Sequence, residues 1–377
     1  MRKVLRSFVA LFVAMFVAAF FTLGATLPAH AATLPAKFIK LAAAPILAKP
    51  GIIVIDPATE KILYANRSDV GRAPASVLKL VSMTAALKVF GSDKIFHTSL
   101  YESNKPDTYL LSGESDPWLT ASLFEAGKYH RAFSPSLINA LIKDHPGVRT
   151  FAIDYNGVYT ADIQILKRYF SGRVTLNFHS LSSAAAATSE MGSKIAAVAS
   201  PPLSAIAEFT LLWSDNLLAD RLARTAARQL GHPTSAAGIQ QTFEDTLASL
   251  GIHTTGLVIK DGNGLSKETR ISTRTIAELL VKIKQDPLLQ DIYLGLPVAG
   301  ETGTLKSRFV TDAPHAVGLV KAKTGWINGT VSLAGYVTVG SAQYVFAVIA
   351  DHIKPTEYSR TLAREAIDQM LASIARS

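Results

Sequence analysis

Strand-like sequence lies near both ends of this 377-residue chain, and this placement constrains the fold more than any other feature. Residues 51–56 and 61–65 are short runs around a proline-containing turn, which predicts a hairpin. Near the other end, three runs alternate or are continuously apolar: 316–324, 329–339 and 344–350. Strands at both ends, with helices between and after them, predict a mixed α/β (α+β) fold. One sheet would be built from both termini and covered by helices.

Four segments are predicted to be helical: 76–90, 203–230, 272–283 and 356–374. The first is apolar throughout and is expected to be buried, and the third would be capped by Ser272 or Thr273.

Between these helices the sequence changes character. Short strand-like pieces at 108–111 and 148–154 are broken by Gly, Pro, Ser and Asp, and the Ala/Ser-rich stretch 182–199 is expected to be a loop or a weak helix. The chain is therefore expected to have three parts: a leader at 1–31, a main domain at 32–97 and 200–377, and an inserted module at 98–199.

The leader has the pattern of a secretory signal. Cations within the first six residues precede an apolar run at 8–23 and an Ala-x-Ala-like site that ends at Ala31. This predicts a signal peptide cleaved after Ala31 and secretion across the cytoplasmic membrane, into the cell wall or a periplasmic space. An uncleaved anchor is the alternative, although a run of about 16 residues is shorter than the roughly 20 of a spanning helix.

Composition excludes several classes of protein. The chain has no cysteine, which rules out disulfides, Cys-based zinc sites and a thiol nucleophile. Hydrophobic residues make up 49% of the chain, enough for a sizeable core. The net charge of +9 favours peripheral contact with anionic wall polymers or lipid headgroups. No basic run carries interleaved aromatics, which argues against nucleic acid as a partner.

The first motif that carries chemistry is Ser76-Val77-Leu78-Lys79. Residues three apart share a helix face, so the Ser76 hydroxyl and the Lys79 amine can meet. Lysine can activate a serine only if burial lowers its pKa, and the apolar neighbours of Lys79 supply that setting. By itself the pair is equally consistent with an ordinary helix start and a solvated lysine.

Two further motifs follow in order. In Ser214-Asp215-Asn216, the Ser214 hydroxyl could relay a proton to a leaving amine, and the Asn216 amide could bind the substrate backbone and Lys79. A polar helix face or a helix junction is the alternative. In 323–325, Lys323 and Thr324 could bind a carboxylate, and Gly325 would let a substrate chain lie against the strand. A strand end that meets a turn is the alternative.

Together, Ser-x-x-Lys, Ser-Asp-Asn and Lys-Thr-Gly resemble the motifs of penicillin-binding proteins and class A β-lactamases. Further segments are similar to the D-alanyl-D-alanine carboxypeptidase/endopeptidase family, the low-molecular-mass penicillin-binding proteins with an inserted module: 113–117, 200–203, 261–266, 303–308 and 332–336. The resemblance implies a β-lactamase/transpeptidase-like domain with an antiparallel sheet. It also implies peptidoglycan stem peptides as substrates and β-lactam antibiotics as inhibitors, without a metal or cofactor.

By the same resemblance, Ser76 is the nucleophile and Lys79 its base, while Ser214 and Lys323 pass a proton to the departing D-Ala. Thr324 would help to hold the carboxylate of that residue. The backbone N–H groups of Ser76 and Trp326 would hold the oxyanion, although the family usually has Thr where this chain has Trp326.

Other functions remain open at this stage. A serine β-lactamase is one, but no Glu-x-x-x-Asn lies between Asn216 and Lys323. A non-catalytic wall-binding protein on the same fold is another. A Ser-His-Asp hydrolase or a zinc peptidase is disfavoured, because Gly-x-Ser-x-Gly and His-Glu-x-x-His are both absent. Carboxypeptidase and endopeptidase activity use the same site and cannot be separated by sequence.

Overall fold

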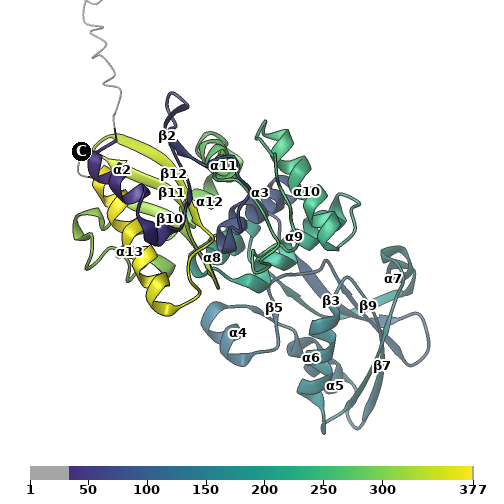
Figure 1. Ribbon diagram of the computed structural model, residues 1–377. Coiled ribbons are helices and arrows are strands. Elements are labelled where there is room, and N and C mark those ends of the chain that lie inside the picture. The colour runs from purple at the N-terminus through teal and green to yellow at the C-terminus, as the bar shows by residue number, and fades with distance from the viewer. Residues whose placement is uncertain (1–33, 376–377) are drawn as a thin grey trace, which may run out of the picture. The chain divides into compact units, whose positions relative to one another are not determined.

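An antiparallel five-stranded sheet in the order β10-β11-β12-β1-β2 joins the two ends of the chain (Figure 1). Its strands are β1 (Gly51–Asp56), β2 (Lys61–Asn66), β10 (Val320–Ile327), β11 (Thr330–Val339) and β12 (Ala342–Ala350). The computed structural model describes residues 34–375, so the leader predicted at 1–31 lies outside the described residues. The sheet expected from both termini is confirmed.

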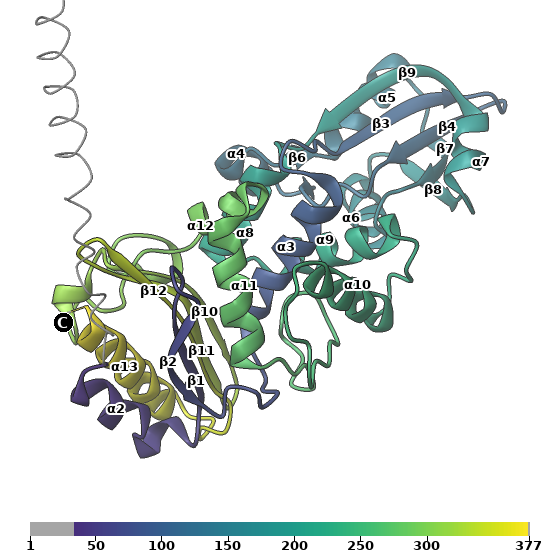
Figure 2. The same cartoon turned by 90° about the horizontal axis from the view of Figure 1, so that it is seen from above.

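Both faces of this sheet are buried, and β1 shows why. Side chains of a strand alternate between the faces, so Ile52 and Val54 enter one apolar cluster while Ile53 and Ile55 enter another. The first cluster lies under α2 (Ala36–Ala42) and α13 (Glu357–Ile374), which Figure 2 shows together on one side of the sheet. The continuous apolar run of 51–55 is the sequence signature of this double burial.

The second cluster belongs to the helices on the other face: α3 (Lys79–Phe90), α8 (Leu203–Trp213), α9 (Asn216–Gln229), α10 (Ala236–Ser249), α11 (Thr273–Gln285) and α12 (Gln290–Leu294). Helix α3 is buried at every position from Lys79 to Leu87 and contacts α8, α9, α10 and α11. A helix that is apolar on all sides has its stable place at the centre of such a group. The short 3-10 turn Ala75–Leu78 precedes it and carries Ser76.

The single helix predicted over 203–230 is wrong. Ser214 adopts a left-handed conformation with φ of 61°, and the chain restarts as α9. The Asp215 carboxylate accepts a hydrogen bond from the Leu218 N–H at 2.9 Å and caps the new helix. Apolar periodicity runs through the break, so it conceals a junction made by a local side chain–backbone bond.

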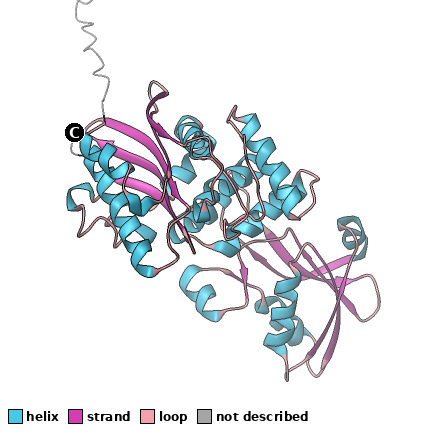
Figure 3. Cartoon of the chain, in the orientation of Figure 1, coloured by secondary structure: helices cyan, strands magenta, loops and turns pink. Residues whose placement is uncertain are grey.

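Residues 97–199 form a second five-stranded sheet, in the order β8-β7-β4-β3-β9 (Figure 3). Its strands are β3 (His97–Ser103), β4 (Thr108–Gly113), β7 (Thr150–Asn156), β8 (Thr175–Ser180) and β9 (Met191–Ala199). Helices α5 (Pro135–Asp144) and α6 (Thr160–Phe170) pack on it around Leu111, Phe151 and Phe170. This sheet has its own apolar cluster, and the division into a main domain and an inserted module remains our proposal.

Smaller elements complete this region: β5 (Leu119–Thr120), α4 (Leu123–Tyr129), β6 (Ala132–Phe133) and α7 (Ala184–Glu190). The expectation of a loop or weak helix over 182–199 is wrong for its second half, which is strand β9. Pairing of β9 with β3 decides the conformation there, against the Ala/Ser-rich composition. Among residues 34–375, no helix is long and apolar enough to cross a membrane.

A buried ion pair holds the segment before Ser76 against the sheet. Arg72 donates to Asp351 at 2.5 Å and to the carbonyl oxygen of Lys49 at 2.8 Å, and the Ala73 N–H donates to Asp351 at 3.2 Å. Both charged side chains are almost fully buried. The pair therefore ties residues 72–73 to the end of β12.

Replacement of Asp351 by Ala should lower the free energy of unfolding by about 3–5 kcal/mol, because the buried Arg72 cation loses its partner. The matched control is Asp69→Ala, which removes an exposed pair with Arg274 and should cost about 0–1 kcal/mol. Urea unfolding followed by circular dichroism measures both. Equal losses in the two variants would contradict the account of Arg72 and Asp351.

Candidate active site

The position of Ser76 is set by contacts between its turn and the central strands. The buried Ser332 hydroxyl of β11 donates to the carbonyl oxygen of Pro74 at 2.6 Å. Ala75 has a positive φ of 50°, so the chain turns sharply just before the serine. Ser76 is half-buried and lines a cavity at the edge of β10. The serine is therefore presented to solvent from a turn that is fixed from beneath.

Gly325 makes this arrangement possible. A Cβ atom at this position would lie 2.3 Å from Ser332 Oγ, 2.9 Å from the Pro74 oxygen and 3.0 Å from the Ser76 nitrogen. The missing side chain therefore leaves room for the turn that carries Ser76. Gly325 also lines the cavity, and its role in admitting a substrate chain stays a prediction.

Lys79 is fully buried, and its ammonium nitrogen contacts three oxygen atoms. Nζ lies 2.8 Å from each of Ser76 Oγ, Asn216 Oδ1 and the Asn263 carbonyl oxygen. None of these acceptors is charged. Burial lowers the pKa of Lys79 to about 7, although Asp261 and Asp215 act in the opposite direction. Near neutral pH this lysine can therefore accept a proton from a group that touches it.

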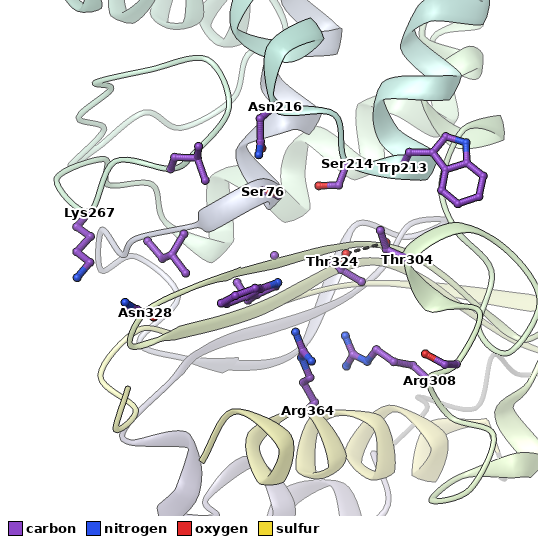
Figure 4. A pocket seen from close by; sticks show the side chains of 15 residues that line it. Ser76, Trp213, Ser214, Asn216, Lys267, Thr304, Arg308, Thr324, Asn328 and Arg364 are labelled. Carbon is purple, nitrogen blue, oxygen red and sulfur yellow. Dashed lines mark hydrogen bonds between the residues drawn. The ribbon is translucent and has the colours of Figure 1, made fainter. Parts of the chain in front are cut away.

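The break between α8 and α9 aims two of the predicted residues at the cavity. Asn216 is the first residue of α9, and Figure 4 shows it together with Ser214 on the side of the cavity opposite Thr324. The left-handed turn at Ser214 and the cap at Asp215 allow residues 214 and 216 to reach the cavity together. A continuous helix would turn two such residues about 200° apart.

Lys323 lies behind the cavity wall and does not line it. It is fully buried, and Nζ donates to the carbonyl oxygen of Thr324 at 3.0 Å. Its pKa is lowered well below the usual range by burial and by the nearby Lys79. Thr324 does line the cavity, and its hydroxyl donates to Thr304 Oγ1 at 2.8 Å (Figure 4). Of the two residues predicted to bind a carboxylate, Thr324 therefore reaches the cavity and Lys323 does not.

The loop 261–266 supplies contacts to which the sequence analysis gave no role. Asp261 accepts hydrogen bonds from the Gly264 N–H at 2.8 Å and the Ser266 N–H at 2.7 Å, and this shapes the turn. The turn presents the Asn263 carbonyl oxygen to Lys79. The Asp-Gly-x-Gly pattern is the sequence signal for such a turn.

The cavity has a volume of about 660 Å³ and gathers residues from distant parts of the chain. Five of the predicted residues line it together with Ser76: Ser214, Asn216, Thr324, Gly325 and Trp326. Trp213, Arg308 and Arg364 also line the cavity and were not predicted as site residues; of these three, Arg308 alone lies in a segment that resembles the family, 303–308. Among the described residues that line the cavity, none is an aspartate or a glutamate.

A buried lysine beside a serine hydroxyl, with an asparagine and a Lys-Thr-Gly strand around them, is the arrangement of residues typical of penicillin-binding proteins and serine β-lactamases. Comparison with family models identifies the particular family: the D-Ala-D-Ala carboxypeptidase 3 (S13) family matches residues 36–132 and 177–374. The chain belongs to this family.

One curated relative is the carboxypeptidase DacB of Mycolicibacterium smegmatis, 38% identical over 191 residues, which are 49% of this chain and 40% of that protein. The matched segments span less than half the length of the curated relatives. Penicillin-binding protein 4 of Haemophilus influenzae has a similar fold, with a TM-score of 0.70, 17% identity and coverage of 90% of this chain and 98% of that one. The same protein in complex with a β-lactam gives a TM-score of 0.67 at 19% identity, over 88% and 98% of the two chains.

The substitution Gly325→Ala should destabilise the protein by about 1–3 kcal/mol, because its methyl group overlaps Ser332 and the backbone beside Ser76. Gly127→Ala is the matched control, since a Cβ there has no neighbour within 4 Å. Thermal and urea unfolding measure both variants. If Gly325→Ala proved as stable as the control, the close approach of β10 to the turn would be refuted.

Proposed function

We propose that this protein is an exported serine-type D-Ala-D-Ala peptidase that acts on peptidoglycan stem peptides through an acyl-serine intermediate. The observation that carries the proposal is the 2.8 Å contact between Ser76 Oγ and a buried Lys79 Nζ whose pKa is lowered to about 7. Membership of the D-Ala-D-Ala carboxypeptidase family supports the substrate class.

In the acylation step, Ser76 Oγ forms a bond to the penultimate carbonyl carbon, and its proton passes to neutral Lys79. The N–H groups of Ser76 and Trp326 would hold the oxyanion that forms. When the tetrahedral intermediate collapses, the C–N bond breaks and the amine of the terminal residue leaves. Ser214 would deliver its proton to this amine, and the proton that Lys79 took from Ser76 would replace it, so that Lys79 becomes neutral again and Ser214 keeps its hydroxyl. Buried Lys323 would support this transfer from behind the cavity wall.

In the deacylation step, a water molecule attacks the ester and regenerates Ser76. Lys79, again neutral, is the base nearest the ester oxygen. No carboxylate from the described residues lines the cavity to activate water in its place. This favours slow release of a β-lactam adduct, so penicillins would act as inhibitors and not as substrates that are turned over quickly.

Export rests on the leader predicted at 1–31, and it would bring the enzyme to its polymeric substrate in the cell wall or a periplasmic space. The basic net charge favours peripheral contact with anionic wall or membrane surfaces. Carboxypeptidase and endopeptidase reactions share the acylation chemistry and differ in the size of the leaving group.

A fluorescent penicillin should label the wild-type protein and should not label Ser76→Ala. The same two proteins are then incubated with purified peptidoglycan, and the products are identified by mass spectrometry. We expect loss of one terminal D-Ala with the wild type only. Ser189→Ala, on an exposed face of α7, is the control and should behave as wild type.

Equal labelling of the wild type and Ser76→Ala would contradict the assignment of the nucleophile. Cleavage of cross-linked dimers without loss of terminal D-Ala would replace the carboxypeptidase by an endopeptidase. Rapid turnover of benzylpenicillin would replace it by a β-lactamase.

The rate of penicillin acylation should rise about tenfold per pH unit below pH 7 and level off above it. Below its pKa Lys79 is protonated and cannot take the Ser76 proton, whereas above it the amine is free. Stopped-flow labelling between pH 5 and 9 measures the profile.

Asp215→Asn is the matched variant for this profile. It keeps a capping side chain but removes a negative charge that raises the pKa of Lys79, so the midpoint should move to lower pH. A midpoint that moves upward, or a flat wild-type profile, would contradict the role of Lys79 as base.

A further inference from the structure

Two of the three oxygen atoms that contact Lys79 Nζ can only accept hydrogen bonds. These two are Asn216 Oδ1 and the carbonyl oxygen of Asn263, each at 2.8 Å. The third is the Ser76 hydroxyl oxygen, also at 2.8 Å, which can donate or accept. A neutral amine has two N–H groups and one lone pair. When each carbonyl oxygen takes one N–H, the lone pair is left pointing at Ser76.

Gly262, the residue before Asn263, is held by side chains from two helices. Its N–H donates to the Asp220 carboxylate of α9 at 2.9 Å, and its carbonyl oxygen accepts from the buried Ser82 hydroxyl of α3 at 2.5 Å. Helices α3 and α9 contact each other and lie side by side in Figure 2. The helices that carry the lysine and the asparagine of the site therefore also fix the loop 261–266.

The loop lies so close to α9 that it has little freedom to shift. A Cβ atom at Gly262 would lie 2.5 Å from Ala223 Cβ and 3.0 Å from the Ala219 carbonyl oxygen. Small displacements of the loop toward α9 would therefore meet atoms of the helix, and displacements away from it would break the bond to Asp220. The position of the next carbonyl group along the chain follows from these anchors.

Asp220 acts at a distance from the cavity, since it is not among the described residues that line it. Its Oδ2 atom lies 2.7 Å from Arg224 Nε, one turn later on α9, while Oδ1 accepts the Gly262 N–H. The ion pair with Arg224 thus leaves one carboxylate oxygen for the loop.

The charged groups that face Lys79 come from α9, the loop and β10. Burial lowers the pKa of Lys79 to about 7 against Asp261 and Asp215, which raise it, and buried Lys323 lies near enough for the two amines to repel each other. The charge of Asp220 is not among the causes of the shift in Lys79. What Asp220 supplies to the site is therefore the position of the loop.

We propose that Asp220 and Ser82 are positioning residues that act on the reaction through the loop 261–266. They hold the Asn263 carbonyl oxygen where it takes one N–H of the neutral Lys79 amine, so that the lone pair faces the nucleophile. This inference rests on the proposed function, because it takes Lys79 as the base of the acylation step.

The test follows the rate of penicillin acylation at Ser76 between pH 5 and 9. Asp220→Ala removes the acceptor of the Gly262 N–H, so the loop carbonyl can leave Lys79 and the lone pair can turn away. The plateau rate should fall about 10- to 100-fold. A carbonyl acceptor also stabilises the ammonium form, so its loss should move the midpoint of the profile to lower pH.

Arg224→Met is the matched control, because it removes the ion pair of Asp220 but leaves the carboxylate to accept from Gly262. Its profile should match that of the wild type. Asp220→Asn is then made in the Arg224→Met background, since the amide N–H of the new side chain would otherwise face the guanidinium group. This double variant restores an acceptor without the charge, and it should regain the wild-type midpoint and a plateau within about threefold of wild type.

Ser82→Ala removes the other anchor and tests the same mechanism if Asp220→Ala does not fold. Its midpoint should move in the same direction with a smaller loss of rate, because Asp220 still binds the Gly262 N–H. Circular dichroism checks that each variant is folded.

The outcomes separate this inference from the proposed function. If the wild type is not acylated at Ser76, or its profile is flat, the proposed function fails. If the wild type shows the expected profile and a folded Asp220→Ala or Ser82→Ala keeps the wild-type midpoint, the peptidase stands and the positioning role is refuted. A lower plateau at an unchanged midpoint indicates a structural role only. A double variant that behaves like Asp220→Ala would assign the effect to the lost charge and would also refute the role of the loop contact.

Discussion

Burial of the Lys79 amine is the constraint on which the rest of this site depends. An ammonium group in such a position must find hydrogen-bond acceptors, and it finds three oxygens that carry no charge. Acidic acceptors would have kept the lysine protonated, whereas neutral ones let burial lower its pKa to about 7. The Asp215 and Asp261 carboxylates are occupied by backbone N–H groups of their own turns.

The packing around Ser76 brings its hydroxyl group close to the buried Lys79 amine. The turn before α3 must lie against β10 and β11 so that the hydroxyl and the amine meet at the cavity edge. Gly325 leaves room for that turn, Ser332 binds it through Pro74, and the central position of α3 buries Lys79. A methyl group at residue 325 would compete with the hydrogen bond that fixes the turn.

The basic side chains in and behind the cavity wall differ in how strongly burial favours their neutral form. Lys79 and Lys323 have amines that burial pushes toward the neutral form, which suits proton transfer. On the α13 side, Arg364 remains a cation even with a lowered pKa, because the guanidinium group starts from a much higher value.

The sequence by itself determined the sheet from both chain ends and a buried helix predicted over 76–90, of which the first turn is a 3-10 turn and the rest is α3. It also selected the motif residues that the fold gathers, because apolar periodicity and short motifs are local properties. It left open whether residues 214–216 form a helix face or a helix junction, since the periodicity of 203–230 continues through the break made by the Asp215 cap. Strand β9 was hidden for a related reason: its partner β3 lies about ninety residues earlier.

Only the tertiary structure decided the contacts that tune the site. The carbonyl oxygen of Asn263 reaches Lys79 across 184 positions of sequence, and a backbone atom leaves no mark on residue identity. Arg364 has no distinguishing neighbour in the chain, and it lines the cavity because α13 packs where Arg364 reaches Trp326 of β10. Local patterns predict which side chains are available, whereas long-range packing decides which of them are buried, paired or left facing a ligand.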